Sequence, residues 1–196
     1  MPLKLQTLKE LLVSPHEALS KVAKAKNKNE AIAMLIINWI LVALAVSLAS
    51  QKYELLPAVL TFGILGTLVV AFFVQLAFVT IGGKGDYTSV LIASTYPFFG
   101  AAFSSFIVSL IFLWSEIAAI IIGVLLFALY LTVAFTGSFR VLKESFKLDI
   151  VTIWIVTSLL MLAFFASVYS MVILYYFKTG LETGILSSLL KSTTLY

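Results

Sequence analysis

The chain has 196 residues, of which 62% are hydrophobic and 11% are charged, and its mean hydropathy is +1.12. These values exclude an ordinary water-soluble domain, because too few polar residues are present to cover a surface that faces water. The formal net charge is +4. The chain contains no cysteine, which excludes disulfides, thiol nucleophiles and cysteine-ligated metals. The composition therefore predicts an integral membrane protein.

Residues 1–30 form a polar-rich N-terminal segment in which we expect an amphipathic helix. Ser14 has the position of an N-cap, Pro15 follows at the first helical position, and Glu17 stands three residues after the cap, which is the pattern of a capping box. Three lysines then recur on one helical face, and these are Lys21, Lys24 and Lys28. Another face carries Ala18, Leu19 and Val22.

Two interpretations of this N-terminal helix are open. It can lie in the headgroup region with its lysines toward anionic lipid headgroups, or it can be an ordinary solvated helix. The first is favoured because the helix ends only a few residues before the first apolar stretch.

Five apolar stretches follow, each about as long as a bilayer crossing requires and none with a charge in its middle. A helix needs on the order of 20 apolar residues to cross a hydrocarbon core roughly 30 Å thick. The stretches cover residues 31–50, 56–81, 89–114, 117–137 and 150–177. The prediction is an all-α, five-helix transmembrane domain over residues 31–177, followed by a short extracytoplasmic tail over residues 178–196.

The distribution of lysine and arginine predicts the orientation of these spans. With a cytoplasmic N-terminus, ten of the thirteen Lys and Arg residues fall on the cytoplasmic side, and only Lys52, Lys178 and Lys191 fall on the other. We therefore expect the N-terminus inside and the C-terminus outside. The same bias explains the sequence pI of about 9.2, so a nucleic-acid partner is not expected.

The connection between the second and third stretches is rich in glycine. Three glycines in four positions permit positive φ and close backbone approach, so a tight reversal is predicted. Asp86 is placed to cap the next helix. The connection lacks the spacing and the Lys-Ser/Thr ending of a P-loop, so nucleotide binding is not expected. Its residues are Gly82, Gly83, Lys84, Gly85, Asp86 and Tyr87.

Pro97, directly after Tyr96, interrupts the third apolar stretch. Proline lacks the backbone donor that would pair with the carbonyl of Ala93, and in lipid that carbonyl must find another partner. Two arrangements are open. Ser94, Thr95 or a neighbouring helix supplies the donor, or the segment up to Tyr96 lies partly in the interface and the crossing begins at Pro97.

A second amphipathic segment follows the fourth stretch. Apolar Phe139, Leu142 and Phe146 alternate there with basic Arg140, Lys143 and Lys147 at helical spacing. We expect this segment to lie along the cytoplasmic surface. It can be a basic docking surface for a partner or anionic lipid, or ordinary positive-inside anchoring, and the latter is favoured because multi-span proteins need such anchors.

The residues do not favour an enzyme. General acid-base catalysis needs ionisable groups gathered in a pocket, and the apolar stretches contain almost none. His16 is the only histidine, and Glu116 lies in the expected turn between the third and fourth stretches. No catalytic residue, metal site or cofactor is predicted.

The order of these features resembles the Yip1 family of five-span membrane proteins. The segment around Ser14 and Pro15 resembles the Ser-Pro element that precedes the first span in prokaryotic members. The glycine turn, followed by Tyr96 and Pro97, is similar to the family's Gly-Gly-x-Gly and Tyr-x-Pro pattern. The resemblance implies a non-catalytic protein of a prokaryotic plasma membrane. The short N-terminal segment does not support the small-GTPase binding of eukaryotic members.

The predicted function is a scaffold or membrane-organising factor, similar to trafficking proteins, that acts through helix-helix and lipid contacts. Its expected partners are anionic lipids, other membrane proteins or further copies of itself. The alternative is a channel-like protein that transports lipid or a small solute. Neutral polar residues at membrane depth more often bond between helices than line a path, and Gly63 and Gly66 suit close helix packing, so the scaffold is favoured.

Overall fold

The computed structural model describes residues 5–163 and Ser170. The chain divides into two compact units, Met1–Trp154 and Ile155–Tyr196. All regular elements among the described residues are helices, which confirms the predicted all-α class. The predicted tail, 178–196, lies outside the described residues.

Four helical segments in the described part of the chain are long and apolar enough to cross a membrane. They are α3 (Lys28–Ser50), α4 (Leu55–Thr80), the pair α5 (Tyr87–Thr95) and α6 (Phe99–Phe112), and α7 (Glu116–Phe146). A shorter apolar helix covers Ile150–Ala163. The rest of the predicted fifth span lies outside the described residues, except for Ser170.

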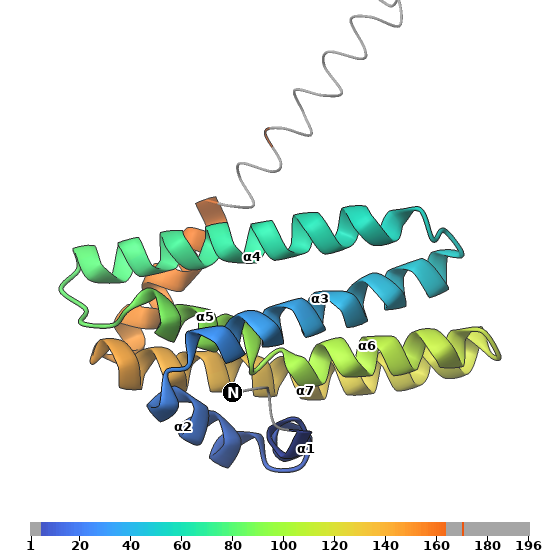
Figure 1. Cartoon of the computed structure of the whole chain (residues 1–196), viewed down its shortest axis with the longest axis horizontal. Coiled ribbons are helices and arrows are strands. Elements are labelled where there is room, and N and C mark those ends of the chain that lie inside the picture. Colours follow the sequence, from blue (N-terminus) through green and yellow to red (C-terminus); the bar gives the residue numbers. More distant parts are fainter. Residues whose placement is uncertain (1–4, 164–169, 171–196) are drawn as a thin grey trace, which may run out of the picture. The chain divides into compact units, whose positions relative to one another are not determined.

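The four segments of the first unit lie side by side, and each runs antiparallel to the one before it in the chain (Figure 1). The turn after α3 and the turn between α6 and α7 lie at one end, which we call the Trp114 end. The glycine turn and the C-terminus of α7 lie at the other, the glycine-turn end. The antiparallel arrangement follows from the short connections. A turn of a few residues cannot carry the chain back across the bundle, so each helix begins at the end where the previous one stopped.

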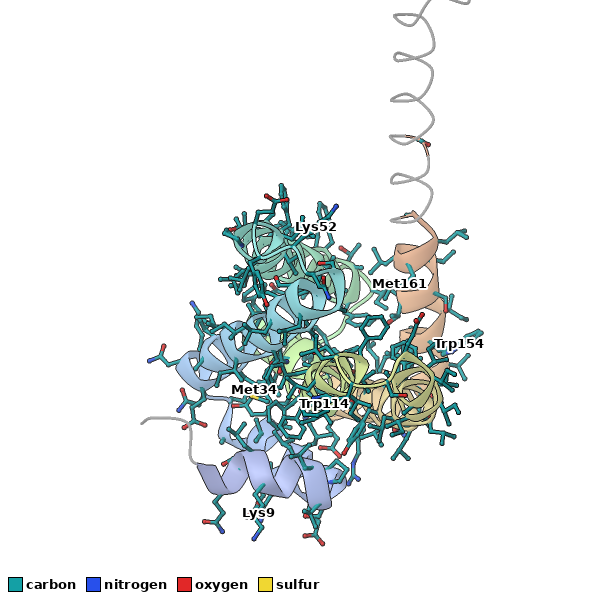
Figure 2. The ribbon with its side chains drawn as sticks, turned by 90° about the vertical axis from the view of Figure 1, so that its right-hand side faces the viewer. Lys9, Met34, Lys52, Trp114, Trp154 and Met161 are labelled. Carbon is teal, nitrogen blue, oxygen red and sulfur yellow. The ribbon has the colours of Figure 1, made fainter. Side chains whose placement is uncertain are left out.

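The helices approach closely at glycines. A Cβ at Gly63 of α4 would collide with the Trp39 ring of α3, which confirms the packing predicted for Gly63; Gly66 faces open space instead. The Trp39 indole donates a hydrogen bond to Thr67 Oγ1 at 2.9 Å, which ties the same two helices together. Met34 of α3 is fully buried, whereas Lys9 points away from the bundle (Figure 2).

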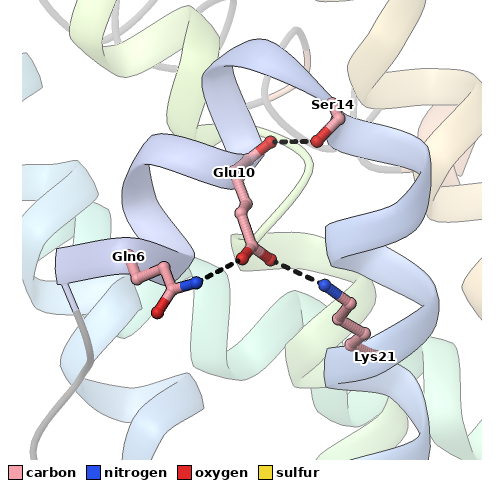
Figure 3. Close-up of polar contacts among 4 residues, drawn as sticks. All are labelled: Gln6, Glu10, Ser14 and Lys21. Atoms are coloured by element: carbon pink, nitrogen blue, oxygen red, sulfur yellow. Dashed lines mark hydrogen bonds and ion pairs between the residues drawn. The ribbon is translucent and has the colours of Figure 1, made fainter.

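The N-terminal segment forms two helices, α1 (Leu5–Val13) and α2 (Pro15–Ala25). The prediction that Pro15 begins a helix is confirmed, but the predicted capping box is wrong. The Ser14 side chain makes no cap bond to α2, and its hydroxyl donates to the Glu10 carbonyl at 3.5 Å (Figure 3). The reason is that α1 ends directly before Ser14, so the Ser14 hydroxyl donates to one of the carbonyls left unpaired at the end of α1.

The amphipathic pattern of α2 is confirmed, but protein covers its apolar face. Ala18 and Leu19 are each only 1% exposed, and α2 packs on α5 and α7. A Cβ added to Gly137 of α7 would lie 2.6 Å from Leu19 Cδ1. The apolar face of α2 is therefore part of the core of the first unit.

The amphipathic segment after the fourth predicted span does not form a helix of its own, and its position along the cytoplasmic surface stays a prediction. α7 continues without interruption from Glu116 to Phe146, a length of about 46 Å. No proline interrupts it, and Val141, Leu142 and Phe146 of its last turns are buried. The helix ends only at Lys147, whose φ of 54° is left-handed.

Candidate functional site

The glycine turn ends α4 with a specific hydrogen-bond motif. Gly82 has φ 91°, its N–H donates to the Val79 carbonyl at 3.0 Å, and the Gly83 N–H donates to the Phe78 carbonyl at 2.8 Å. These two bonds define a Schellman motif, which needs a left-handed residue and so favours glycine there. The predicted tight reversal is confirmed.

The other glycines of the turn make room for the end of α7. A Cβ on Gly85 would lie 2.5 Å from the Phe146 ring, and one on Gly83 would lie 2.9 Å from Phe146 Cδ1. Between them, the Lys84 N–H donates to the Phe146 carbonyl at 3.1 Å and satisfies one of the last carbonyls of α7. All three glycines thus have a structural role, whereas the Lys84 side chain is exposed.

Asp86 caps α5, as predicted. Its carboxylate accepts hydrogen bonds from the Ser89 N–H at 2.8 Å and the Ser89 hydroxyl at 2.6 Å, and Lys26 Nζ lies 3.4 Å away. Burial raises the pKa of Asp86, but the hydrogen bonds from Ser89 and the charge of Lys26 outweigh it, so the pKa lies below its usual value. Tyr87 follows the cap, and its hydroxyl donates to the Leu68 carbonyl of α4 at 3.1 Å.

The break at Pro97 separates α5 from α6, and neighbouring helices satisfy the carbonyls near it. Ser138 Oγ of α7 donates to the Ala93 carbonyl at 2.7 Å, and Asn38 Nδ2 of α3 donates to the Thr95 carbonyl at 2.7 Å. This confirms the first of the two predicted arrangements. Tyr96, within the break, is 1% exposed. The interfacial depth of the segment up to Tyr96 stays a prediction.

Most other polar groups inside the long helices bond to their own backbone. The hydroxyls of Ser104, Ser105, Ser109 and Thr132 each donate to a carbonyl three or four residues earlier. The prediction that such groups join helices thus holds for Asn38 but not for these four.

Three of the six predicted lipid-headgroup residues come together at the glycine-turn end. Lys21 and Lys24 of α2 and Arg140 of α7, with Glu17 and Ser20, line a cavity of about 350 Å³. The other three, Lys28, Lys143 and Lys147, are exposed but do not line it. Sequence periodicity placed the lysines on one face of α2, but it could not show that Arg140, more than a hundred residues later, would join them.

The ion pairs of this basic cavity leave part of its charge free. Lys21 pairs with Glu10 at 3.1 Å, and Gln6 holds the other oxygen of Glu10 at 3.2 Å (Figure 3). Arg140 uses its Nε to bond Glu144 at 3.1 Å. Lys24 has no ion-pair partner in the part of the chain that the structure describes.

A second cavity, of about 340 Å³, lies between α3, α6 and α7 and is mostly apolar. Sequence reasoning had not found it, because its small residues come from three separate helices. Its wall includes Ala45, Ala49, Ser104, Ser105, Ser109 and Gly123. No group of three His, Cys, Asp or Glu residues within residues 5–163 could hold a metal ion.

No protein-family model, curated protein or solved structure matches the chain. The features above define the class, a helical membrane bundle with several apolar helices. The resemblance to the Yip1 family rests on the quoted residues alone and stays a prediction.

Proposed function

We propose that this protein is a multi-pass membrane scaffold of Yip1 type, which organises other membrane components through helix-helix and lipid contacts and carries out no catalysis. The observation that supports this most is the use of polar groups inside the bundle. Asn38, Ser138 and Trp39 join one helix to another. In the four long segments the Asp, Glu, Lys and Arg residues lie only in the first turn or the last two turns, whereas coupled transporters usually place charged groups at membrane depth.

The apolar surface of the long helices gives such a scaffold its means of contact. α4 and α7 bury fewer of their residues than α3 and the α5–α6 pair do, and many of their large apolar side chains are exposed. In a bilayer these faces contact either lipid tails or partner helices. A partner helix binds where the two surfaces are complementary enough in shape to pack closely. Large exposed side chains on these faces include Phe62, Leu65, Phe72, Phe73, Leu125 and Phe127.

The proposed orientation places the glycine-turn end in the cytoplasm. Lys84, Arg140, Lys143 and the lysines of α2 gather at this end, whereas Lys52 is the only Lys or Arg in the described turns of the Trp114 end. This asymmetry supports a cytoplasmic N-terminus, because basic residues flanking a span are retained inside. The prokaryotic plasma membrane follows only from the family resemblance.

Photo-crosslinking in native membranes tests the scaffold. A photoreactive phenylalanine analogue at exposed Phe72 of α4 should give a discrete protein adduct, and the same analogue at fully buried Phe78 serves as the matched control. The scaffold predicts an adduct of defined mass at position 72 that is absent at 78. The same analogue is also placed at exposed Leu125 of α7. If positions 72 and 125 both give only lipid adducts and no protein adduct, the proposal is contradicted.

The cavity lined by three serines supports a second candidate, a conduit for lipid or a small neutral solute. Their hydroxyl donors are used within α6, which leaves acceptor lone pairs for a passing polar group. Reconstitution into liposomes with lipid-scrambling and solute-leak assays separates the two functions. Flux that is lost in Ser105→Leu would favour the conduit, and absence of flux would favour the scaffold.

A further inference from the structure

The basic cavity between α2 and α7 stands at the boundary between the apolar and polar parts of α7. Leu19 of α2 rests on Gly137, the last residue of the fourth predicted span, and Arg140 follows one helical turn later. The docking of α2 therefore brings Lys21 and Lys24 to the level where a lipid phosphate would lie if α7 crosses a bilayer.

Two cations of this cavity have donors to offer a ligand. Lys24 has no ion-pair partner among the described residues, and Arg140 uses only its Nε for Glu144, which leaves the terminal guanidinium nitrogens. Lys21 is already held by Glu10. A phosphate oxygen is the natural acceptor for such a pair, because guanidinium and ammonium groups make short, charge-assisted bonds to it.

The surface that leads to Arg140 is exposed and combines leucines with threonines whose hydroxyls bond the backbone of their own helix. Thr136, Leu129 and Leu125 precede Arg140 by four, eleven and fifteen residues, so all four lie along one stripe of α7, and each is exposed. A lipid whose phosphate occupies the cavity can lay an acyl chain along this stripe. A free phosphate ion would gain nothing from it.

We infer that Lys24 and Arg140 bind the headgroup phosphate of an anionic phospholipid in the cavity between α2 and α7. Lys21 adds a further positive charge, the Ser20 hydroxyl can donate to a phosphate oxygen, and the Glu17 carboxylate can accept from a headgroup hydroxyl. A choline headgroup would bring a fourth cation to a site that already holds three. The site therefore selects phosphatidylglycerol over phosphatidylcholine.

This inference rests on the membrane placement of the chain and not on the scaffold role. Lipid binding is measured on the purified chain, so the result depends neither on flux nor on the presence of a protein partner. Failure of lipid selectivity would thus leave the crosslinking result of the scaffold untouched, and the reverse also holds.

Native mass spectrometry of the full chain in detergent, titrated with phosphatidylglycerol or phosphatidylcholine, tests the site. Wild type should bind a first phosphatidylglycerol at least about tenfold more tightly than phosphatidylcholine, because each cation near a phosphate contributes measurably to affinity. Lys24→Gln/Arg140→Gln should lose about tenfold in phosphatidylglycerol affinity. The matched control Lys143→Gln/Lys147→Gln removes the same charge from the same end outside the cavity and should change affinity less than about twofold.

A second pair of measurements keeps the result clear of folding effects and free anions. Lys24→Arg/Arg140→Lys keeps both charges and should bind within about threefold of wild type, with an unchanged melting temperature. Inorganic phosphate at millimolar concentration should not displace the lipid. Equal loss in the cavity and control variants, equal affinity for the two lipids, or displacement by inorganic phosphate would each overturn the inference.

Discussion

Two regions of the bundle carry a residue that disfavours helix, and they respond in opposite ways. At Pro97 the third span breaks into α5 and α6, whereas α7 runs straight through Gly137. The two residues lie against each other, since a Cβ on Gly137 would be 3.2 Å from Pro97 Cβ. Proline removes a donor and forces a break, while glycine keeps its N–H and only weakens the helix by about 1 kcal/mol.

The difference shows that a break is stable only where side chains of other helices donate hydrogen bonds to the carbonyls that the break leaves unpaired. The carbonyls of Ala93 and Thr95 are paired with Ser138 and Asn38 from two other helices. Gly137 in turn gives Pro97 and Leu19 the space to pack against α7. An unpaired carbonyl in an apolar interior costs several kcal/mol. The continuous helix α7 avoids this cost at the break, because it places Ser138 where its hydroxyl can donate to the Ala93 carbonyl.

The largest effect is expected from filling the space at Gly137. Gly137→Leu should lower the free energy of unfolding by about 3 kcal/mol, since both Leu19 and Pro97 would have to move. Thermal unfolding in detergent measures it. Gly66→Leu is the matched control, because nothing lies within 4 Å of its Cβ position. Equal destabilisation by both substitutions would contradict the proposed role of Gly137.

The next effect is expected at the contact between the glycine turn and the end of α7. Gly85→Ala places a methyl group 2.5 Å from the Phe146 ring and should destabilise by about 2 kcal/mol. Lys84→Ala, next to it, should change stability by less than about 0.5 kcal/mol, because only its backbone contacts Phe146. Limited proteolysis at the glycine-turn end reports both. A stability loss of similar size in Lys84→Ala would assign a structural role to the lysine side chain.

A double-mutant cycle sharpens the account of the break itself. Ser138→Ala should cost about 1.5 kcal/mol in wild type, because the Ala93 carbonyl loses its donor. In a Pro97→Ala background residue 97 regains an N–H, so the third span straightens, its proteolytic fragments change, and the loss from Ser138→Ala falls by at least about half. Ser105→Ala, whose hydroxyl bonds its own helix, is the control. Identical losses in both backgrounds would exclude this pairing as the reason for the serine.

The smallest effect is expected at the start of the broken span. Asp86→Asn should cost about 0.5 kcal/mol at pH 7, because asparagine can still accept the hydrogen bond from the Ser89 N–H but lacks the negative charge that is favourable at a helix N-terminus. Because the folded pKa of Asp86 lies below its unfolded value of 3.8, this stability is present above pH 3.8 and is lost as pH falls through the folded pKa. Melting curves of wild type and variant should converge there.

Lys26→Gln separates the two contributions to the Asp86 cap. It removes only the exposed ion pair and should lower stability by less than about 0.5 kcal/mol. A constant gap between wild type and Asp86→Asn down to pH 2 would show that the carboxylate charge contributes nothing.

Several features were predictable because they depend only on neighbours in the chain. The apolar runs predicted the long helices, and glycine spacing predicted the tight reversal that Gly82 completes. The capping box at Ser14 failed because helix α1, immediately before it, competes for the same side chain. The sequence did not show that the helix of the fourth predicted span continues past Gly137, because apolar contacts carry α7 further, to Phe146.

By itself the sequence determined that the chain is built of long apolar helices, because an uncharged run of that length is suited to little else. It also determined where they turn and that Pro97 frees a carbonyl. Only the tertiary structure decided which group donates a hydrogen bond to that carbonyl and that protein covers the apolar face of α2. It also decided that Arg140 lines the same cavity as Lys21 and Lys24. Those outcomes depend on contacts between helices that are far apart in the sequence. Helical periodicity describes only one helix at a time, so it cannot predict such contacts.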